Sequence, residues 1–191
     1  MKSLRSLICI VSLFSLATTA AAQTPSTPDA QKSFDSLKAL AGTWKGALTV
    51  TPPQPDIDAK QLWVSLRVTS RGNAIVHEIK QPGTPDEVNH DDPITLLYMD
   101  GDKLYLTHYC DAGNRPRMVA RTWPDGKTVE FEFVDLSGGT QFGHMHHAVF
   151  TIIDANHHLE DWTYMMPGDK PVHAHFDLQR VAQSQQTSGK D

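Results

Sequence analysis

Between Thr43 and Val181 the side chains alternate between hydrophobic and polar over ten separate stretches. Val129, Phe131 and Phe133 alternate with Glu130 and Glu132, for example, which is the period-two pattern of a strand with one buried and one solvated face. Nearly all of this region is therefore predicted to be β-strand. The predicted strands are residues 43–51, 61–69, 74–80, 94–100, 103–110, 117–123, 127–135, 144–153, 158–166 and 171–181.

Short turns separate several of these strands. Asp100-Gly101-Asp102 and Pro124-Asp125-Gly126 have the composition of tight hairpins, so strands that are neighbours in sequence are predicted to pair antiparallel. A meander of eight to ten strands must close on itself or split into two packed sheets. The predicted fold is all-β, an antiparallel up-and-down barrel of about ten strands, with a β-sandwich as the alternative.

One short helix is predicted before the first strand. Phe34, Leu37 and Leu40 follow Ser33 at helical spacing, and Gly42 is expected to end the helix. The barrel domain is therefore assigned to residues 33–181. The flanking segments 23–32 and 182–191 are rich in Pro, Ser, Thr, Gln and Lys, and we interpret them as a flexible linker and a disordered tail.

The first 22 residues are typical of a cleavable signal peptide. Lys2 and Arg5 precede an apolar run, which ends in the small residues Ala20, Ala21 and Ala22. The run is shorter than the roughly 20 apolar residues that span a membrane. We expect cleavage after about Ala22, which would place the protein in the periplasm or outside the cell, with no membrane insertion afterwards.

Cleavage changes the charge and the thiol content of the chain. It removes two basic residues and no acidic ones, so the net charge of −5 becomes −7, which argues against nucleic acid as a partner. It also removes Cys9 and leaves Cys110 as the single thiol, so no internal disulfide can form.

Two sets of motifs resemble known families. The segment from Leu40 to Gly46 (Leu-Ala-Gly-Thr-Trp-Lys-Gly) resembles the opening of calycin-type barrels, which include lipocalins, fatty-acid-binding proteins and nitrobindin. In those families the Trp, here Trp44, packs across the barrel floor. Residues 106–118 and 143–147 resemble an uncharacterised bacterial group of exported lipocalin-like proteins. That resemblance implies a fold but no activity.

Several polar residues are predicted to line a ligand cavity. Parity with Leu104 and Leu106 directs His108 and Cys110 inward. On strand 144–153 both faces contain apolar residues, and the size of Phe150 favours the face that carries His144 and His146. The predicted ligand-binding set is His108, Cys110, Asn114, Arg117, His144 and His146, with Trp44 closing one end. Arg117 can bind a carboxylate or phosphate, or can instead pair with a neighbouring acid.

Two cofactor hypotheses follow from the histidines. If His108, His144 and His146 converge, they can bind zinc or copper, whereas the alternative is a polar lining or an internal hydrogen-bond network. The segment around His173 resembles the region of nitrobindin-type barrels that binds haem, which implies His173 as a haem ligand, although parity directs this residue outward. His157 and His158 are expected to be solvated in a turn.

Enzymatic activity has little support among the motifs. The sequence contains no Gly-x-Ser-x-Gly elbow, phosphate loop or His-Glu-x-x-His helix. His108 and Cys110 lie side by side on one strand and need not form a nucleophile and base pair. The leading hypothesis is an exported barrel that binds a small molecule in a cavity lined by His, Cys and Arg. The alternative is a metal- or haem-binding barrel that uses the same histidines, with or without catalysis.

Overall fold

The computed structural model describes residues 28–54, 61–80, 93–122 and 126–182. This part of the chain contains one α-helix, ten strands and a single 3-10 turn at Ser70–Gly72. The predicted signal peptide and most of the predicted tail lie outside the described residues. The elements are α1 (Pro28–Lys38), β1 (Gly42–Thr51), β2 (Gln61–Thr69), β3 (Ala74–Lys80), β4 (Ile94–Asp100), β5 (Lys103–Tyr109), β6 (Arg115–Thr122), β7 (Thr128–Ser137), β8 (His144–Asp154), β9 (His157–Met166) and β10 (Lys170–Arg180).

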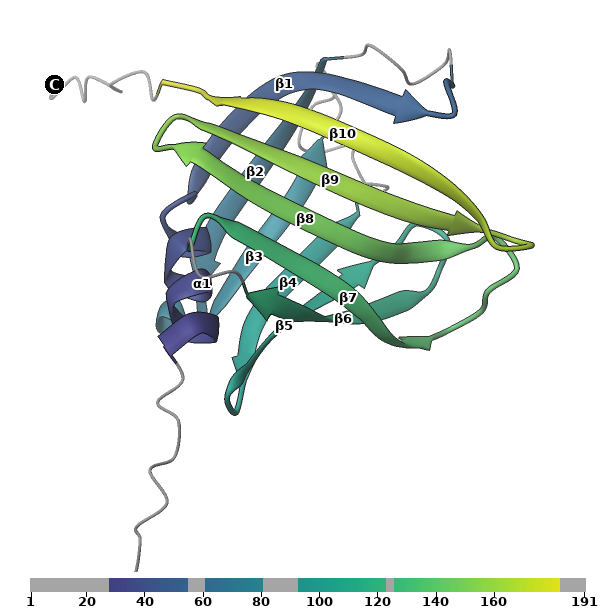
Figure 1. Ribbon diagram of the computed structural model, residues 1–191, viewed down its shortest axis with the longest axis horizontal. Coiled ribbons are helices and arrows are strands. Elements are labelled where there is room, and N and C mark those ends of the chain that lie inside the picture. The colour runs from purple at the N-terminus through teal and green to yellow at the C-terminus, as the bar shows by residue number, and fades with distance from the viewer. Residues whose placement is uncertain (1–27, 55–60, 81–92, 123–125, 183–191) are drawn as a thin grey trace, which may run out of the picture.

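The ten strands form a closed barrel in which each strand pairs antiparallel with its neighbour in sequence, and β10 closes the barrel against β1. Figure 1 shows α1 at one end of this barrel, next to the start of β1. The predicted fold class is confirmed, and every predicted strand is present with ends that differ by at most two residues. The helix begins earlier than predicted, at Pro28, inside the segment that was interpreted as a linker.

The closure between β1 and β10 depends on a glycine. A Cβ atom at Gly46 would lie 1.7 Å from the carbonyl oxygen of Asp177, far inside van der Waals contact. Gly46 pairs with Leu178 across this seam, so only a residue without a side chain allows the two backbones to approach this closely. This requirement explains the second glycine of the motif at the start of β1.

The helix end of the barrel is closed by Trp44. Its side chain is fully buried, its Nε1 donates a hydrogen bond of 2.8 Å to the Leu40 carbonyl, and the Arg180 guanidinium lies 4.2 Å above its ring. Arg180 also donates to the carbonyls of Ala39 and Ala41, just beyond the last turn of α1. Trp44 therefore ties the helix, β1 and β10 together, in the position that the resemblance to calycin-type barrels implies.

A β-bulge in β8 changes which residues face inward. Ala148 and Phe150 are buried in the core, as parity predicted. The pairing of β8 with β9 then shifts by one residue between Met145 and His147, and the extra residue resets the alternation. Met145 consequently packs against the core, and the strict inward alternation predicted for His144 and His146 does not extend past the bulge.

Candidate functional site

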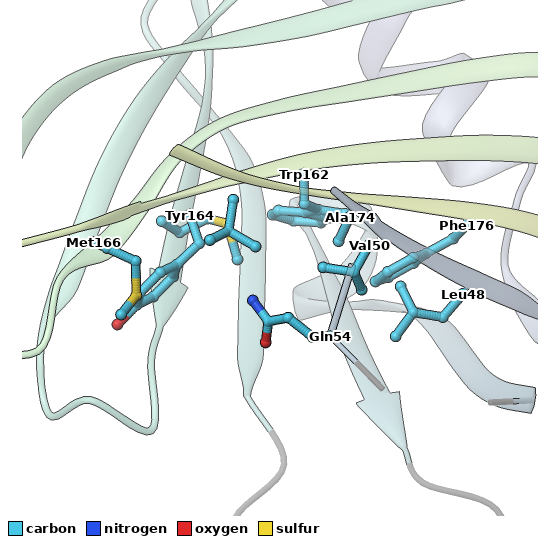
Figure 2. Close-up of a pocket in the computed structure, with 10 residues that line it drawn as sticks. Leu48, Val50, Gln54, Trp162, Tyr164, Met166, Ala174 and Phe176 are labelled. Carbon is cyan, nitrogen blue, oxygen red and sulfur yellow. The ribbon is translucent and has the colours of Figure 1, made fainter. Parts of the chain in front are cut away.

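A cavity of about 300 Å³ lies inside the barrel at the end opposite α1. Figure 2 shows the side chains that surround it. They come from the far part of β1 and its following loop, the start of β8, the end of β9 and the first half of β10. The lining residues are Leu48, Val50, Gln54, Met145, Trp162, Tyr164, Met166, Val172, Ala174 and Phe176.

Strand alternation explains why these walls are apolar. Val172, Ala174 and Phe176 are alternate residues of β10, and Trp162 and Tyr164 are alternate residues of β9, so each set points to one side of the sheet. None of the ten lining residues carries a charge. Ala174 is small, and the space beside it stays open.

None of the seven residues predicted to bind ligand lines this cavity. The prediction placed polar side chains from β5, β6 and β8 around it, whereas its walls are mainly apolar side chains from β1, β9 and β10. Met145 of β8 does contribute, because the bulge turns it inward in place of its histidine neighbours.

Beyond the inner wall of the cavity lies a buried carboxylate. Trp162 lines the cavity, and its Nε1 donates a 2.9 Å hydrogen bond to Glu160 Oε2. Nε2 of His77 lies 3.1 and 3.0 Å from the two Glu160 oxygens, and Nε2 of His158 lies 3.0 Å from Oε1. We call these four residues, Trp162, Glu160, His77 and His158, the Glu160 cluster. Its carboxylate and both its imidazoles are completely buried.

The surroundings of Glu160 keep it ionised. Burial alone would raise its pKa, but the charge interaction with His77 and the hydrogen bonds from His158 and His77 outweigh burial and lower the pKa far below its usual value. An ionised carboxylate can only accept hydrogen bonds, so both imidazoles donate through Nε2. The Nδ1 atoms of His77 and His158 are buried with no hydrogen-bond partner.

The cluster lies between the closed end and the cavity. The His158 ring meets Trp44 edge-on with centroids 4.2 Å apart, and the His77 ring lies 5.6 Å from Trp162. His158, Glu160, Trp162 and Tyr164 are alternate residues of β9, so one strand connects the closed end, the cluster and the cavity in that order. The wall of the cavity is therefore held by a fully hydrogen-bonded carboxylate.

His108 faces inward, as predicted, and belongs to this interior. It is 1% exposed, its Nδ1 lies 2.8 Å from the Thr95 hydroxyl, and its ring centroid is 5.8 Å from that of Trp162. Burial, reinforced by the charge of His77, lowers its pKa from 6.5 to about 4. His108 is therefore a neutral interior histidine at neutral pH.

Cys110 and Asn114 belong to the loop that follows β5. The Cys110 thiol donates to Asp111 Oδ1 at 3.3 Å, and burial raises its pKa to about 11, so it is a protonated thiol at neutral pH. Asn114 is 1% exposed, and its amide donates to the carbonyls of Gly139 and Gly143. Asn114 therefore links the loop between β5 and β6 to the loop between β7 and β8.

Arg117 does not face the cavity. Its Nη2 donates to Asp135 Oδ2 at 2.5 Å, and its guanidinium lies 5.3 Å from the centroid of the Tyr105 ring. Of the two interpretations open for this residue, the structure shows the ion pair. The pair is substantially exposed, so it adds little to stability.

His144 and His146 contact each other. Nε2 of His144 lies 3.2 Å from Nδ1 of His146, and both rings pack on Phe133 with centroids 5.0 and 4.8 Å away. Burial and the neighbouring His146 lower the pKa of His144. Among the described residues, no three His, Cys, Asp or Glu side chains are arranged so that they could hold a metal ion, so His108, His144 and His146 do not form the predicted set.

The residue implied as a haem ligand lies on the outer face of the barrel. His173 is exposed, and its Nδ1 lies 3.1 Å from the Thr163 hydroxyl. Its neighbours Val172 and Ala174 are the ones that line the cavity. A haem inside the barrel would therefore not meet this imidazole.

Sequence reasoning missed the Glu160 cluster. His158 was expected to be solvated but is completely buried, and neither His77 nor Glu160 was considered. A signal was available, because Glu160 shares its parity with Trp162 and Tyr164, the large aromatic residues of the strand. The opposite face carries Leu159, Asp161 and Thr163, however, so polarity alone does not separate the two faces.

Comparisons with known proteins support the fold and nothing finer. No family model and no curated protein matches the sequence. Rv2717c from Mycobacterium tuberculosis has a similar structure, with a TM-score of 0.53 and 14% identity over 78% of this chain and 98% of that one. A DUF3598-family protein of unknown function from Nostoc punctiforme has a TM-score of 0.52 and 11% identity over 76% of this chain. This chain spans about half, 48%, of the Nostoc protein.

Proposed function

We propose that this protein is an exported barrel that binds a small molecule in the cavity between β1, β8, β9 and β10. The observation that carries the proposal is the apolar cavity of about 300 Å³ at one end of a barrel whose other end holds the buried core around Trp44. Clefts of this size with mainly apolar walls are the usual form of small-molecule sites. The ten-stranded barrel is an architecture that can enclose such a site.

The contrast between the two ends of the barrel supports binding. Protein interiors are close-packed, and an open apolar space forfeits the contacts that filling side chains would make. The α1 end is filled by Trp44 and its neighbours, whereas the opposite end keeps Ala174 at a position where a larger side chain would fill the cavity. Because leaving this space open loses packing contacts, we take the cavity as support for ligand binding.

The ligand is held mainly by apolar contact. The His, Cys and Arg residues first considered for the cavity do not line it, and no group of three or more His, Cys, Asp or Glu side chains among the described residues could hold a metal ion. The polar groups of the lining are the Gln54 amide, the Tyr164 hydroxyl and the Trp162 indole, which already donates a hydrogen bond to Glu160.

Among the described residues, no helix is long and apolar enough to cross a membrane.

Export is the part of the proposal that depends on residues 1–22. Their basic start, apolar run and terminal alanines support cleavage after about Ala22. We expect mass spectrometry of the protein purified from the extracytoplasmic fraction to show a mature chain that begins near Gln23. A full-length chain retained in the cytoplasm would contradict export and leave the cavity proposal intact.

Binding in the cavity is tested by filling it. Ala174→Trp should weaken binding of a neutral, linear fluorescent probe, 1,6-diphenyl-1,3,5-hexatriene, by more than about tenfold, because the indole occupies the open space. The measurement is the rise in probe fluorescence on titration with protein.

The matched control is Ala47→Trp, which places the same side chain on the exposed face of β1 and should leave probe affinity unchanged. Far-UV circular dichroism verifies that both variants are folded. The proposal fails if the parent protein binds no probe, or if a folded Ala174→Trp variant binds it as well as the parent does.

A further inference from the structure

We infer that the cavity takes an uncharged, slender lipophile, a straight hydrocarbon chain that ends in a neutral hydrogen-bonding group such as an alcohol. This ligand class rests on the proposed function, since it concerns the same cavity. Three features of the lining carry the inference: its elongated shape, its lack of charge next to a buried carboxylate, and its few polar groups.

The shape is a slot that runs along the strands. Its walls extend from Val172 to Phe176 on β10 and from Trp162 to Met166 on β9. Because Met166 pairs with Lys170 and Trp162 pairs with Ala174, the two stretches are offset by two residues and together cover six residue steps, about 20 Å at about 3.3 Å each. A volume of about 300 Å³ spread over that length makes the cavity long and narrow, a shape that suits one extended chain better than a bulky fused ring system.

Charge excludes an ionised head group from the slot. Among the described residues, the lining carries no Lys or Arg that could pair with an anion, and the charged group directly behind Trp162 is the Glu160 carboxylate. An anion drawn into the slot would lose its hydration without gaining a partner, which is strongly unfavourable. A cationic head group would also lose its hydration without gaining a partner, because the Glu160 carboxylate already accepts hydrogen bonds from His77, His158 and Trp162.

The polar groups of the lining can form hydrogen bonds with one uncharged hydroxyl group of a ligand. The Tyr164 hydroxyl donates to the Phe142 carbonyl at 2.8 Å, so its oxygen remains able to accept a hydrogen bond from a ligand. In Figure 2 the Gln54 amide lies between Tyr164 and Val50 and faces the same space. The exposed Met166 and the partly buried Met145 add flexible thioethers that adapt to an alkyl chain.

The test compares straight-chain ligands of equal length in competition with 1,6-diphenyl-1,3,5-hexatriene at pH 7.5. We expect 1-octanol to bind at least about tenfold more tightly than octanoate. Among the alcohols, affinity should rise about fourfold per added CH₂ until the chain fills the slot, and then stop rising.

A charge variant provides the reciprocal test. Gln54→Lys should raise the affinity for octanoate relative to that for 1-octanol by at least about tenfold, because the ammonium supplies the missing partner for the carboxylate. The matched control is Thr49→Lys, which adds the same charge on the exposed face of β1 and should change neither affinity.

The outcomes separate the ligand class from the proposed function. If octanoate binds the parent protein as tightly as octanol, or if fused-ring compounds bind best, the ligand class is wrong. Loss of that binding in Ala174→Trp would still support the cavity as the binding site. If neither the probe nor any alcohol binds the parent protein, the proposed function itself fails.

Discussion

Replacing Glu160 with alanine should lower the free energy of unfolding by about 3–5 kcal/mol, the cost of breaking a buried ionic group by removing one partner. Glu160 is completely buried and accepts hydrogen bonds from His77, His158 and Trp162. Without it, three buried donors lose their acceptor at once. Chemical denaturation monitored by circular dichroism measures the change.

Three comparison variants make this result specific. Asp161→Ala removes the neighbouring carboxylate, which pairs with His175 on the exposed face, and should cost less than about 1 kcal/mol. Glu160→Gln keeps the volume and one acceptor and should fall between the two. Replacing Glu160, His77 and His158 together with apolar residues of similar size should recover much of the loss. A loss for Glu160→Ala no larger than that for Asp161→Ala would contradict the assigned hydrogen bonds.

Lowering the pH from 6.5 to about 4 should remove about 3 kcal/mol of stability because of His108 alone. Burial lowers the pKa of this imidazole from 6.5 to about 4 in the folded protein. Across this window the unfolded chain takes up a proton at His108 and the folded protein does not. The unfolded state is therefore favoured as the pH falls, and the effect is complete near the folded pKa.

A variant isolates the contribution of His108 from those of the other histidines. In His108→Gln the free energy of unfolding should fall less steeply between pH 6.5 and 4.5, and the difference from the parent protein is the quantity of interest. His173→Gln changes an exposed histidine and should keep the parent slope. Equal slopes in the parent and in His108→Gln would show that His108 is protonated as readily inside the barrel as in water.

The barrel could be predicted from the sequence to within two residues per strand. The reason is that the signal is local. A strand with one buried face must alternate hydrophobic and polar side chains, and residues 129–133 show this alternation independently of the strands that they pack against. Turn residues such as Gly101 then determine that neighbours in sequence pair antiparallel. The helix start was missed because the amphipathic pattern begins only after Ser33, whereas the helix itself starts at Pro28.

The candidate site could not be predicted in the same way. His108 was assigned inward correctly because its strand has an unambiguous apolar face. The bulge between Met145 and His147 reversed the inference for His144, and a bulge depends on pairing with β9 that the sequence of β8 does not reveal. Glu160 was missed because a charged residue is normally solvated, and only the imidazoles of β3 and β9 make its burial tolerable.

The sequence by itself determined the alternation and the turns, and therefore an antiparallel meander of about ten strands after a short helix, for which a closed barrel was the prediction and a sandwich the alternative. These depend on contacts between near neighbours in the chain, whose geometry follows from the backbone. Only the tertiary structure decided where the cavity lies, that its walls come from β1, β9 and β10, and that Glu160 lies behind Trp162. Those features join side chains such as His77 and Glu160, 83 residues apart, which meet only when the barrel closes.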